Sequence, residues 1–173
     1  MTRKNIQTNV CHSSGAWQDD DEPLLRRAAL AAVHADSPDA VTRVGARKDE
    51  SSDFMISLYL CDSQEMTALN EQYRGLSTDT NVLSFWDKEA QRAWQENKQG
   101  VFHLGDVVLA DEVVRREAQD YGFARDIYAC RLTIHGVLHL LGYDHKETMD
   151  ARLMTEKETH AVRAIARNDA LVA

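Results

Sequence analysis

The sequence has 173 residues, of which 43% are hydrophobic and 28% charged, and it contains two prolines and eight glycines. These values are typical of a protein with a packed core and exclude a low-complexity chain, so we predict a single domain over residues 1–173. The formal net charge of -8 argues against indiscriminate nucleic-acid binding. Any contact with nucleic acid must therefore come from a local basic pocket.

The cysteines favour a reducing compartment. Cys11, Cys61 and Cys130 are odd in number, widely spaced and form no C-x-x-C motif. No apolar run follows Arg3 and Lys4, so we expect no secretory signal. No window approaches the roughly 18 apolar residues of a membrane helix. We expect a cytoplasmic protein with no membrane partner.

The first third of the chain predicts one strand and one helix. Residues Asn5–Val10 alternate weakly and fit an edge strand. The acidic run Asp19–Glu22 directly before Pro23 is typical of a helix start, and apolar residues at helical spacing continue to about His34. Residues 41–50 fit either a weak strand or a loop.

A strand, a helix and a second strand follow. Residues Phe54–Leu60 alternate between apolar and mixed positions, which is typical of a strand. Asp62 with Glu65 resembles a capping box, and it predicts a helix that ends near Gly75. Residues Asn81–Phe85 form the next predicted strand.

The central part of the chain combines a polar insert with regular structure. We predict that the insert Asp87–Gly100 is the most mobile segment. Residues Val101–Ala110 contain another strand. Asp111 is then expected to cap a helix that runs to about Tyr121 and is stopped by Gly122.

The C-terminal part is helical. One helix is expected from about Ala124 to Leu141, and it is apolar on nearly all sides from Ile127 onward, as in a central buried helix. Another begins near Thr148, with a frayed tail from Arg167. The element order predicts an α+β fold, in which a mixed sheet of about four strands packs with about five helices.

Three histidines in one stretch suggest a metal site. His135 and His139 are four residues apart, so on a helix they lie on the same face. Gly142 can adopt the left-handed conformation that ends a helix, and the chain can then bring back His145. A histidine pair alone is as often simple packing, but the glycine and the third histidine favour one zinc ion per chain with an open fourth position.

The residue after the first histidine restricts the chemistry. Metzincin proteases carry the pattern H-E-x-x-H-x-x-G-x-x-H, in which the glutamate is the general base. Here that position is Gly136, which has no side chain to move a proton. The stretch therefore predicts a metzincin-like zinc-binding helix and a hydrolytic site, but it disfavours peptide hydrolysis.

The segment His135–His145 closely resembles the signature of the YbeY family of bacterial rRNA-maturation endoribonucleases. The resemblance is strongest over residues 54–160, where several separate motifs occur in the right order. The other matching parts are Leu69–Gly75, Thr80–Phe85, Leu104–Asp106, Met154 and Glu158.

This resemblance implies a single-strand-specific, zinc-dependent endoribonuclease that acts in rRNA processing at the 3′ end of 16S rRNA and in ribosome biogenesis. The implied partners are single-stranded RNA, the small ribosomal subunit and assembly factors. The family's zinc ligands correspond to His135, His139 and His145, and its cleft arginine corresponds to Arg74. We predict that Arg74 and His139 are catalytic, because an arginine fork can hold a phosphate oxygen. Without the resemblance, Arg74 would be interpreted as a solvated cation at a helix end.

The sequence also departs from the family pattern. Leu76, Ser77 and Asp79 replace a lysine, an aspartate and a proline, and Trp86 replaces a proline. Loss of the lysine removes one cationic phosphate contact. This difference motivates a second hypothesis, a ribosome-assembly binding factor with structural zinc. A metalloprotease is a third hypothesis, ranked low because of Gly136.

Several further polar residues have two interpretations each. Asp144 can orient a ligand histidine or cap the turn, and the role of Asp106 is open in the same way. His103 is an isolated histidine that either packs at the surface or lies behind the metal ligands. Four arginines are balanced by nearby acids, so we predict a solvated mixed-charge face rather than an RNA groove. These arginines are Arg115, Arg116, Arg125 and Arg131.

Overall fold

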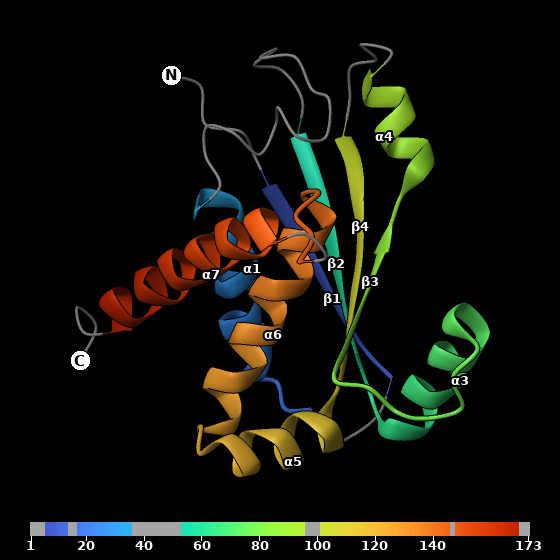
Figure 1. Cartoon of the computed structure of the whole chain (residues 1–173), viewed down its shortest axis with the longest axis vertical. Coiled ribbons are helices and arrows are strands. Elements are labelled where there is room, and N and C mark those ends of the chain that lie inside the picture. The colour runs from blue at the N-terminus through green and yellow to red at the C-terminus, as the bar shows by residue number, and fades with distance from the viewer. Residues whose placement is uncertain (1–5, 14–16, 36–52, 96–100, 146–147, 170–173) are drawn as a thin grey trace.

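The predicted α+β class is confirmed by the computed structural model, in which a four-stranded mixed sheet packs with helices (Figure 1). The structure describes residues 6–13, 17–35, 53–95, 101–145 and 148–169. The segment 41–50, predicted as either strand or loop, lies outside these residues. None of the helices in the described segments is both long enough and apolar enough to cross a bilayer.

The sheet has the strand order β1-β2-β4-β3, in which β1, β2 and β4 are parallel and β3 runs antiparallel to β4. This order leaves β3 at one edge of the sheet. On β2, the buried residues alternate with half-buried ones, as the sequence pattern predicts. The strands are β1 (Ile6–His12), β2 (Asp53–Cys61), β3 (Val82–Trp86) and β4 (Val101–Ala110).

The described residues contain six helices, one more than the approximate number expected. The additional helix lies in the segment that we predicted to be a mobile polar insert. Residues 88–95 are helical because the Asp87 carboxylate accepts hydrogen bonds from the backbone N–H groups of Glu89 and Ala90 and starts a helix. The mobility of the insert stays a prediction. The helices are α1 (Asp21–Ala35), α3 (Ser63–Arg74), α4 (Lys88–Gln95), α5 (Asp111–Tyr121), α6 (Arg125–Leu140) and α7 (Thr148–Asp169).

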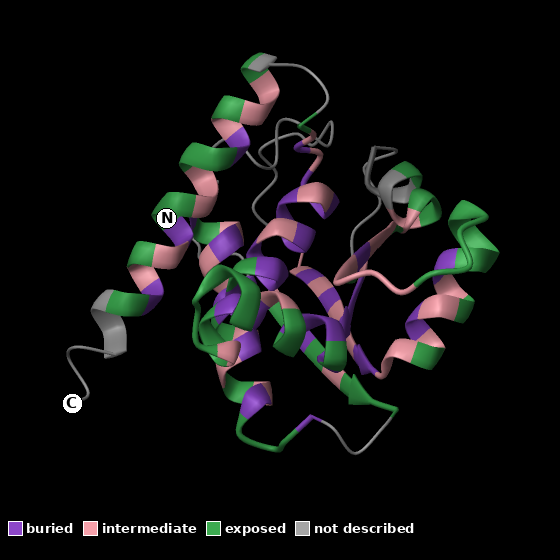
Figure 2. Ribbon diagram, turned by 60° about the horizontal axis from the view of Figure 1, so that its bottom comes forward, coloured by how far each residue is buried: buried purple, intermediate pink, exposed green. Residues whose placement is uncertain are grey.

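The two faces of the sheet bury different cores. On β4, Val107 and Leu109 join the larger cluster, which α1, α6 and α7 complete, whereas Val108 packs with Met66 of α3 on the other face. Helix α6 is the central buried helix, as predicted. Figure 2 shows α7, which leads to the C label, striped by buried and exposed residues, as expected for an amphipathic helix. It extends to Asp169, and residues 170–173 of the tail for which fraying was predicted lie outside the described residues.

Asp111 does not cap α5, contrary to the prediction. The cap position is Ala110, and the Asp111 carboxylate instead accepts hydrogen bonds from Arg115 and Arg125, each at 2.5 Å. Asp111 is only 2% exposed. A carboxylate buried to this extent needs ionic partners, because an unpaired buried charge is costly.

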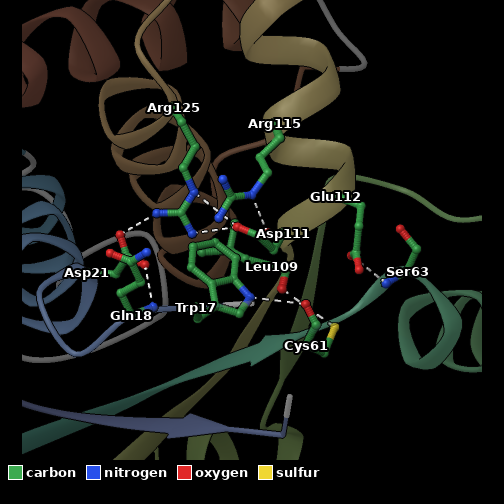
Figure 3. Close-up of polar contacts among 10 residues, drawn as sticks. All are labelled: Trp17, Gln18, Asp21, Cys61, Ser63, Leu109, Asp111, Glu112, Arg115 and Arg125. Carbon is green, nitrogen blue, oxygen red and sulfur yellow. Dashed lines mark hydrogen bonds and ion pairs between the residues drawn. The ribbon is translucent and has the colours of Figure 1, made fainter. Parts of the chain in front are cut away.

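Arg125 joins the starts of three helices (Figure 3). Besides the carboxylate of Asp111 at the start of α5, it binds the carboxylate of Asp21 at the start of α1. Its guanidinium lies over the ring of Trp17, 4.5 Å from the ring centre, and the Trp17 indole donates to the carbonyl of Cys61 at the end of β2. This buried network fixes the end of the molecule opposite the histidine stretch of α6.

Helix α6 lies against the sheet at Gly136. A Cβ atom at this position would lie 2.6 Å from Cγ1 of Val107 and 3.0 Å from the Ser84 hydroxyl oxygen. That hydroxyl donates a hydrogen bond to the Gly136 carbonyl at 3.1 Å. Position 136 therefore faces the strands, and the structure has no room there for the glutamate of a metzincin.

We expect Gly136→Ala to lower the free energy of unfolding by about 1–3 kcal/mol, because the added methyl group overlaps Val107. Urea denaturation of both single variants and of the double variant with Val107→Ala measures the coupling. The double variant should lose less than the sum of its parts, because Val107→Ala makes room for the methyl group. Strictly additive losses would show that the contact with Val107 is not the constraint.

Candidate metal centre

The last turn of α6 ends as the sequence predicts. Gly142 has φ 85°, in the left-handed region. Its N–H donates to the carbonyl of His139, and the N–H of Tyr143 donates to the carbonyl of Leu138, both at 3.0 Å. This pair of bonds is a Schellman motif, and it turns the chain back toward the helix. His145 lies three residues beyond that turn.

The turn brings the three predicted histidines together. One nitrogen from each of His135, His139 and His145 lies within 4.8 Å of the others. The ring centres of His135 and His139 are 4.6 Å apart, and the rings stand nearly perpendicular. His145 is exposed and the other two are half-buried, so the cluster opens to solvent on one side.

Hydrogen bonds set which nitrogen of each helical histidine faces the cluster. The Nδ1 atom of His135 lies 2.6 Å from the Glu158 carboxylate, and the Nδ1 atom of His139 lies 2.8 Å from the Tyr143 carbonyl. A carboxylate and a carbonyl only accept, so both Nδ1 atoms carry the proton. In the neutral rings, both Nε2 atoms then present lone pairs.

These two lone pairs face each other, because the Nε2 atoms of His135 and His139 are 3.0 Å apart. Two lone pairs at this distance repel unless a cation lies between them. Burial, with a smaller contribution from His135 and His145, lowers the pKa of His139 to about 4, so its ring is neutral near pH 7. A cation with three nitrogen ligands at about 2.0–2.1 Å meets this requirement, so the donor set fits a metal ion.

The histidines line a cleft of about 620 Å³ together with Arg74, Ser84 and Trp86. Trp86, which replaces the proline of the family pattern, is 44% exposed. Its indole N–H donates to the carbonyl of Leu140 at the end of α6, at 2.6 Å. The bond fixes the indole beside the end of α6 that carries His139 and leaves much of the side chain open to solvent.

Arg74 reaches this cleft because α3 ends at a left-handed glycine, Gly75, with φ 70°. The buried Asn70 donates from its side chain to the Thr78 carbonyl at 2.8 Å and so holds the following loop. Arg74 is exposed. It has no acidic partner among the residues that the structure describes.

The residues that depart from the family pattern make contacts of their own. Asp79 lies 3.4 Å from the guanidinium of Arg116, and the hydroxyl of Ser77 donates to Glu71 at 3.0 Å. Exposed pairs of this kind contribute little to stability. The altered loop lies between Arg74 and Thr80, which both line the cleft.

The structure shows what two further residues with predicted roles, His103 and Asp144, contact. His103 contacts Ser57, Asp87 and Asp106, at 2.8, 3.5 and 3.4 Å, rather than the three clustered histidines. The Asp144 carboxylate accepts from the backbone N–H of His145 at 2.8 Å.

Two functional contacts were missed by the sequence reasoning. Glu158 had been noted only as a family match, because no local pattern links it to His135, 23 residues away. The Tyr143 carbonyl had no signal beyond the glycine that ends the helix.

The fold and the three convergent imidazoles define an α+β protein with a candidate metal centre at the end of a buried helix. Residues 27–166 match the family described as Endoribonuclease YbeY. The chain is 44% identical to Endoribonuclease YbeY of Rhodospirillum rubrum over 79% of its own length and 65% of that protein. It is 33% identical to the Sphingopyxis alaskensis protein of the same name, over 89% of this chain and 90% of that one.

The chain therefore belongs to the YbeY family, and the resemblance deduced from the sequence is confirmed. A solution structure from Thermotoga maritima supports the fold, with a TM-score of 0.56 and 22% identity over 92% of this chain and 89% of that one. The chain spans just under two thirds of the Rhodospirillum rubrum relative but most of the Sphingopyxis alaskensis one.

We expect Glu158→Gln to weaken divalent metal binding by about 10–100-fold, because the charged acceptor on His135 Nδ1 is lost. Competition with a chromophoric chelator measures the affinity. Glu156→Gln is the matched control, since Glu156 is exposed on the same helix and pairs with Arg152. Equal affinities in the two variants would contradict a supporting role for Glu158.

Proposed function

We propose that this chain is a zinc-dependent endoribonuclease that cuts single-stranded RNA and acts in rRNA processing during maturation of the small ribosomal subunit. Its relatives are named Endoribonuclease YbeY, which supports a nuclease that hydrolyses RNA. We propose likewise that the metal is zinc, that the partners are the small ribosomal subunit and its assembly factors, and that the protein is cytoplasmic. The single observation that carries it is the pair of opposed Nε2 atoms at 3.0 Å in an open cleft.

The donor set favours zinc in a catalytic rather than a structural site. Neutral imidazoles are common zinc ligands, and catalytic zinc sites use three protein ligands and leave one position open. Structural zinc sites have four protein ligands, whereas the cluster in the described residues has three. This difference argues against a binding factor with structural zinc.

Residues of this chain bind the metal ion and supply a positive charge to the phosphate. When bound, zinc supplies Lewis-acid stabilisation of charge on a phosphate oxygen. His135, His139 and His145 hold the ion, and Glu158 keeps the His135 ring in its required tautomer and orientation. Arg74, which is permanently charged and has no acidic partner among the described residues, donates to a non-bridging phosphate oxygen. Both roles stabilise the excess negative charge of phosphodiester hydrolysis.

Two features of the cleft favour single-stranded RNA over peptide. The exposed indole of Trp86 offers a flat face on which an unpaired base can stack. Gly136 provides no general base, and its contact with Val107 leaves no room for one. Peptide hydrolysis by the metzincin mechanism is therefore disfavoured on steric as well as chemical grounds.

We expect the zinc-loaded protein to cut an unstructured RNA oligonucleotide and to spare a fully paired duplex. Removal of the metal by a chelator, or His139→Ala, should abolish cleavage, because the cluster then lacks its ion or a ligand. Gel analysis of end-labelled RNA and metal analysis of the same preparations measure the two effects. His34→Ala, an exposed histidine at the end of α1, is the control. Full cleavage by metal-free protein would overturn the proposal.

We expect Arg74→Ala to reduce kcat/KM for RNA by about 10²–10³-fold, because one donor to the developing phosphate charge is lost. Arg92→Ala is the matched control, since Arg92 is also exposed but lies on α4, outside the residues that line the cleft. Metal content should be equal in both variants. If Arg74→Ala behaves like the control, Arg74 has no part in the mechanism.

A further inference from the structure

A second hollow adjoins the metal cleft. It has a volume of about 470 Å³ and lies between α6 and α7, and we call it the α6–α7 hollow. It shares three lining residues, Asn81, Val82 and His135, with the metal cleft. The two hollows therefore meet at a metal-site histidine, and a chain lying in the cleft can continue into the α6–α7 hollow.

Two arginines line this hollow, Arg131 on α6 and Arg163 on α7, and both are exposed. Neither has an aspartate or glutamate three or four positions away on its own helix, where helical ion pairs form. The guanidinium of Arg131 lies over the ring of Phe123, 5.0 Å from its centre. Stacking of this kind covers one face of the guanidinium and leaves the N–H groups at its edge free to donate.

The acids beside the hollow are engaged elsewhere. Glu158 accepts from His135, and Glu117 accepts from the Asn81 side chain at 2.7 Å and from the Tyr128 hydroxyl at 2.8 Å. The hydroxyls of Thr155 and Thr159, which also line the hollow, donate to carbonyls of their own helix. The two arginines are therefore the cationic donors that the hollow offers to a ligand.

Most of the described arginines without an acidic partner line the two adjoining hollows. Five of the described arginines pair with acids, including three that we predicted to lie on a mixed-charge face: Arg115, Arg116 and Arg125. Among the described side chains, the arginines with no ion pair are Arg74, Arg92, Arg131 and Arg163. All but Arg92 line the two hollows that meet at His135. For Arg131, the predicted mixed-charge face is therefore replaced by a candidate binding surface.

We propose that the α6–α7 hollow is a second phosphate-binding site, in which Arg131 and Arg163 hold the backbone of the RNA strand beyond the metal centre. Guanidinium groups recognise phosphate through paired N–H donors and a permanent charge. Phosphate contacts position a strand without reading its sequence. The hollow would thus fix the register of the RNA at the metal centre, and this inference rests on the proposed nuclease function.

The test compares Arg131→Gln/Arg163→Gln with Arg92→Gln/Arg152→Gln, which removes the same charge from two exposed arginines outside the hollow. With zinc-loaded proteins and a single-stranded RNA of about 12 nucleotides, we expect the first variant to raise KM roughly tenfold with kcat unchanged. Loss of two phosphate contacts should also lower the slope of log KM against log salt by about 1.4. The control variant should keep the KM and salt slope of the wild type.

An RNA too short to enter the α6–α7 hollow gives a second readout. The wild type and the Arg131→Gln/Arg163→Gln variant (the hollow variant) should cut this RNA equally well. If the wild type cuts RNA but the hollow and control variants have the same KM and salt slope, the inference is wrong and the proposed function stands. If the zinc-loaded wild type cuts no RNA, the proposed function fails and the inference fails with it.

Discussion

The close approach of α6 to the sheet at Gly136 is the constraint on which the site depends. With no side chain at this position, the helix backbone lies against Val107 and the hydroxyl of Ser84. Residues three and four apart share a helix face, so His135 and His139 stay together on the side that faces the cleft. A larger residue at 136 would move the helix away from β3 and separate the histidines from Trp86. Gly136 thus lets α6 lie close to the sheet, and it also leaves the site without the general base of a protease.

At the end of α6, the residues that satisfy the last backbone carbonyls of the helix also position the histidine cluster. The last carbonyls of a helix lack partners within the helix. Here Gly142 and Tyr143 satisfy two of them, and the Trp86 indole satisfies that of Leu140. The carbonyl of Tyr143 then accepts from His139 and fixes which nitrogen faces the cluster. Substitutions in this turn would therefore affect helix ending and ligand orientation together.

Local patterns predicted most of the fold and the convergence of the histidines. The alternation in β2, the apolar surface of α6 and the helix-ending Gly142 each depend on residues close in sequence, and each agrees with the structure. One error arose where a distant partner decides: Asp111 was predicted to be a helix cap, but in the structure it is buried and pairs with Arg125. The support of His135 by Glu158 links two helices across 23 residues, so no local pattern could reveal it.

The arrangement of charge explains how an acidic chain could bind the proposed substrate, RNA, which is itself negatively charged. At a net charge of -8, long-range attraction cannot gather RNA over the whole surface. Affinity must then come from a few guanidinium groups that are not neutralised by neighbours. Ion pairing removes five of the described arginines from this role, whereas Arg74, Arg131 and Arg163 line the two hollows that meet at His135. Acids elsewhere on the surface disfavour RNA bound in other positions, so the same charges that weaken overall binding favour a strand that lies across the metal centre.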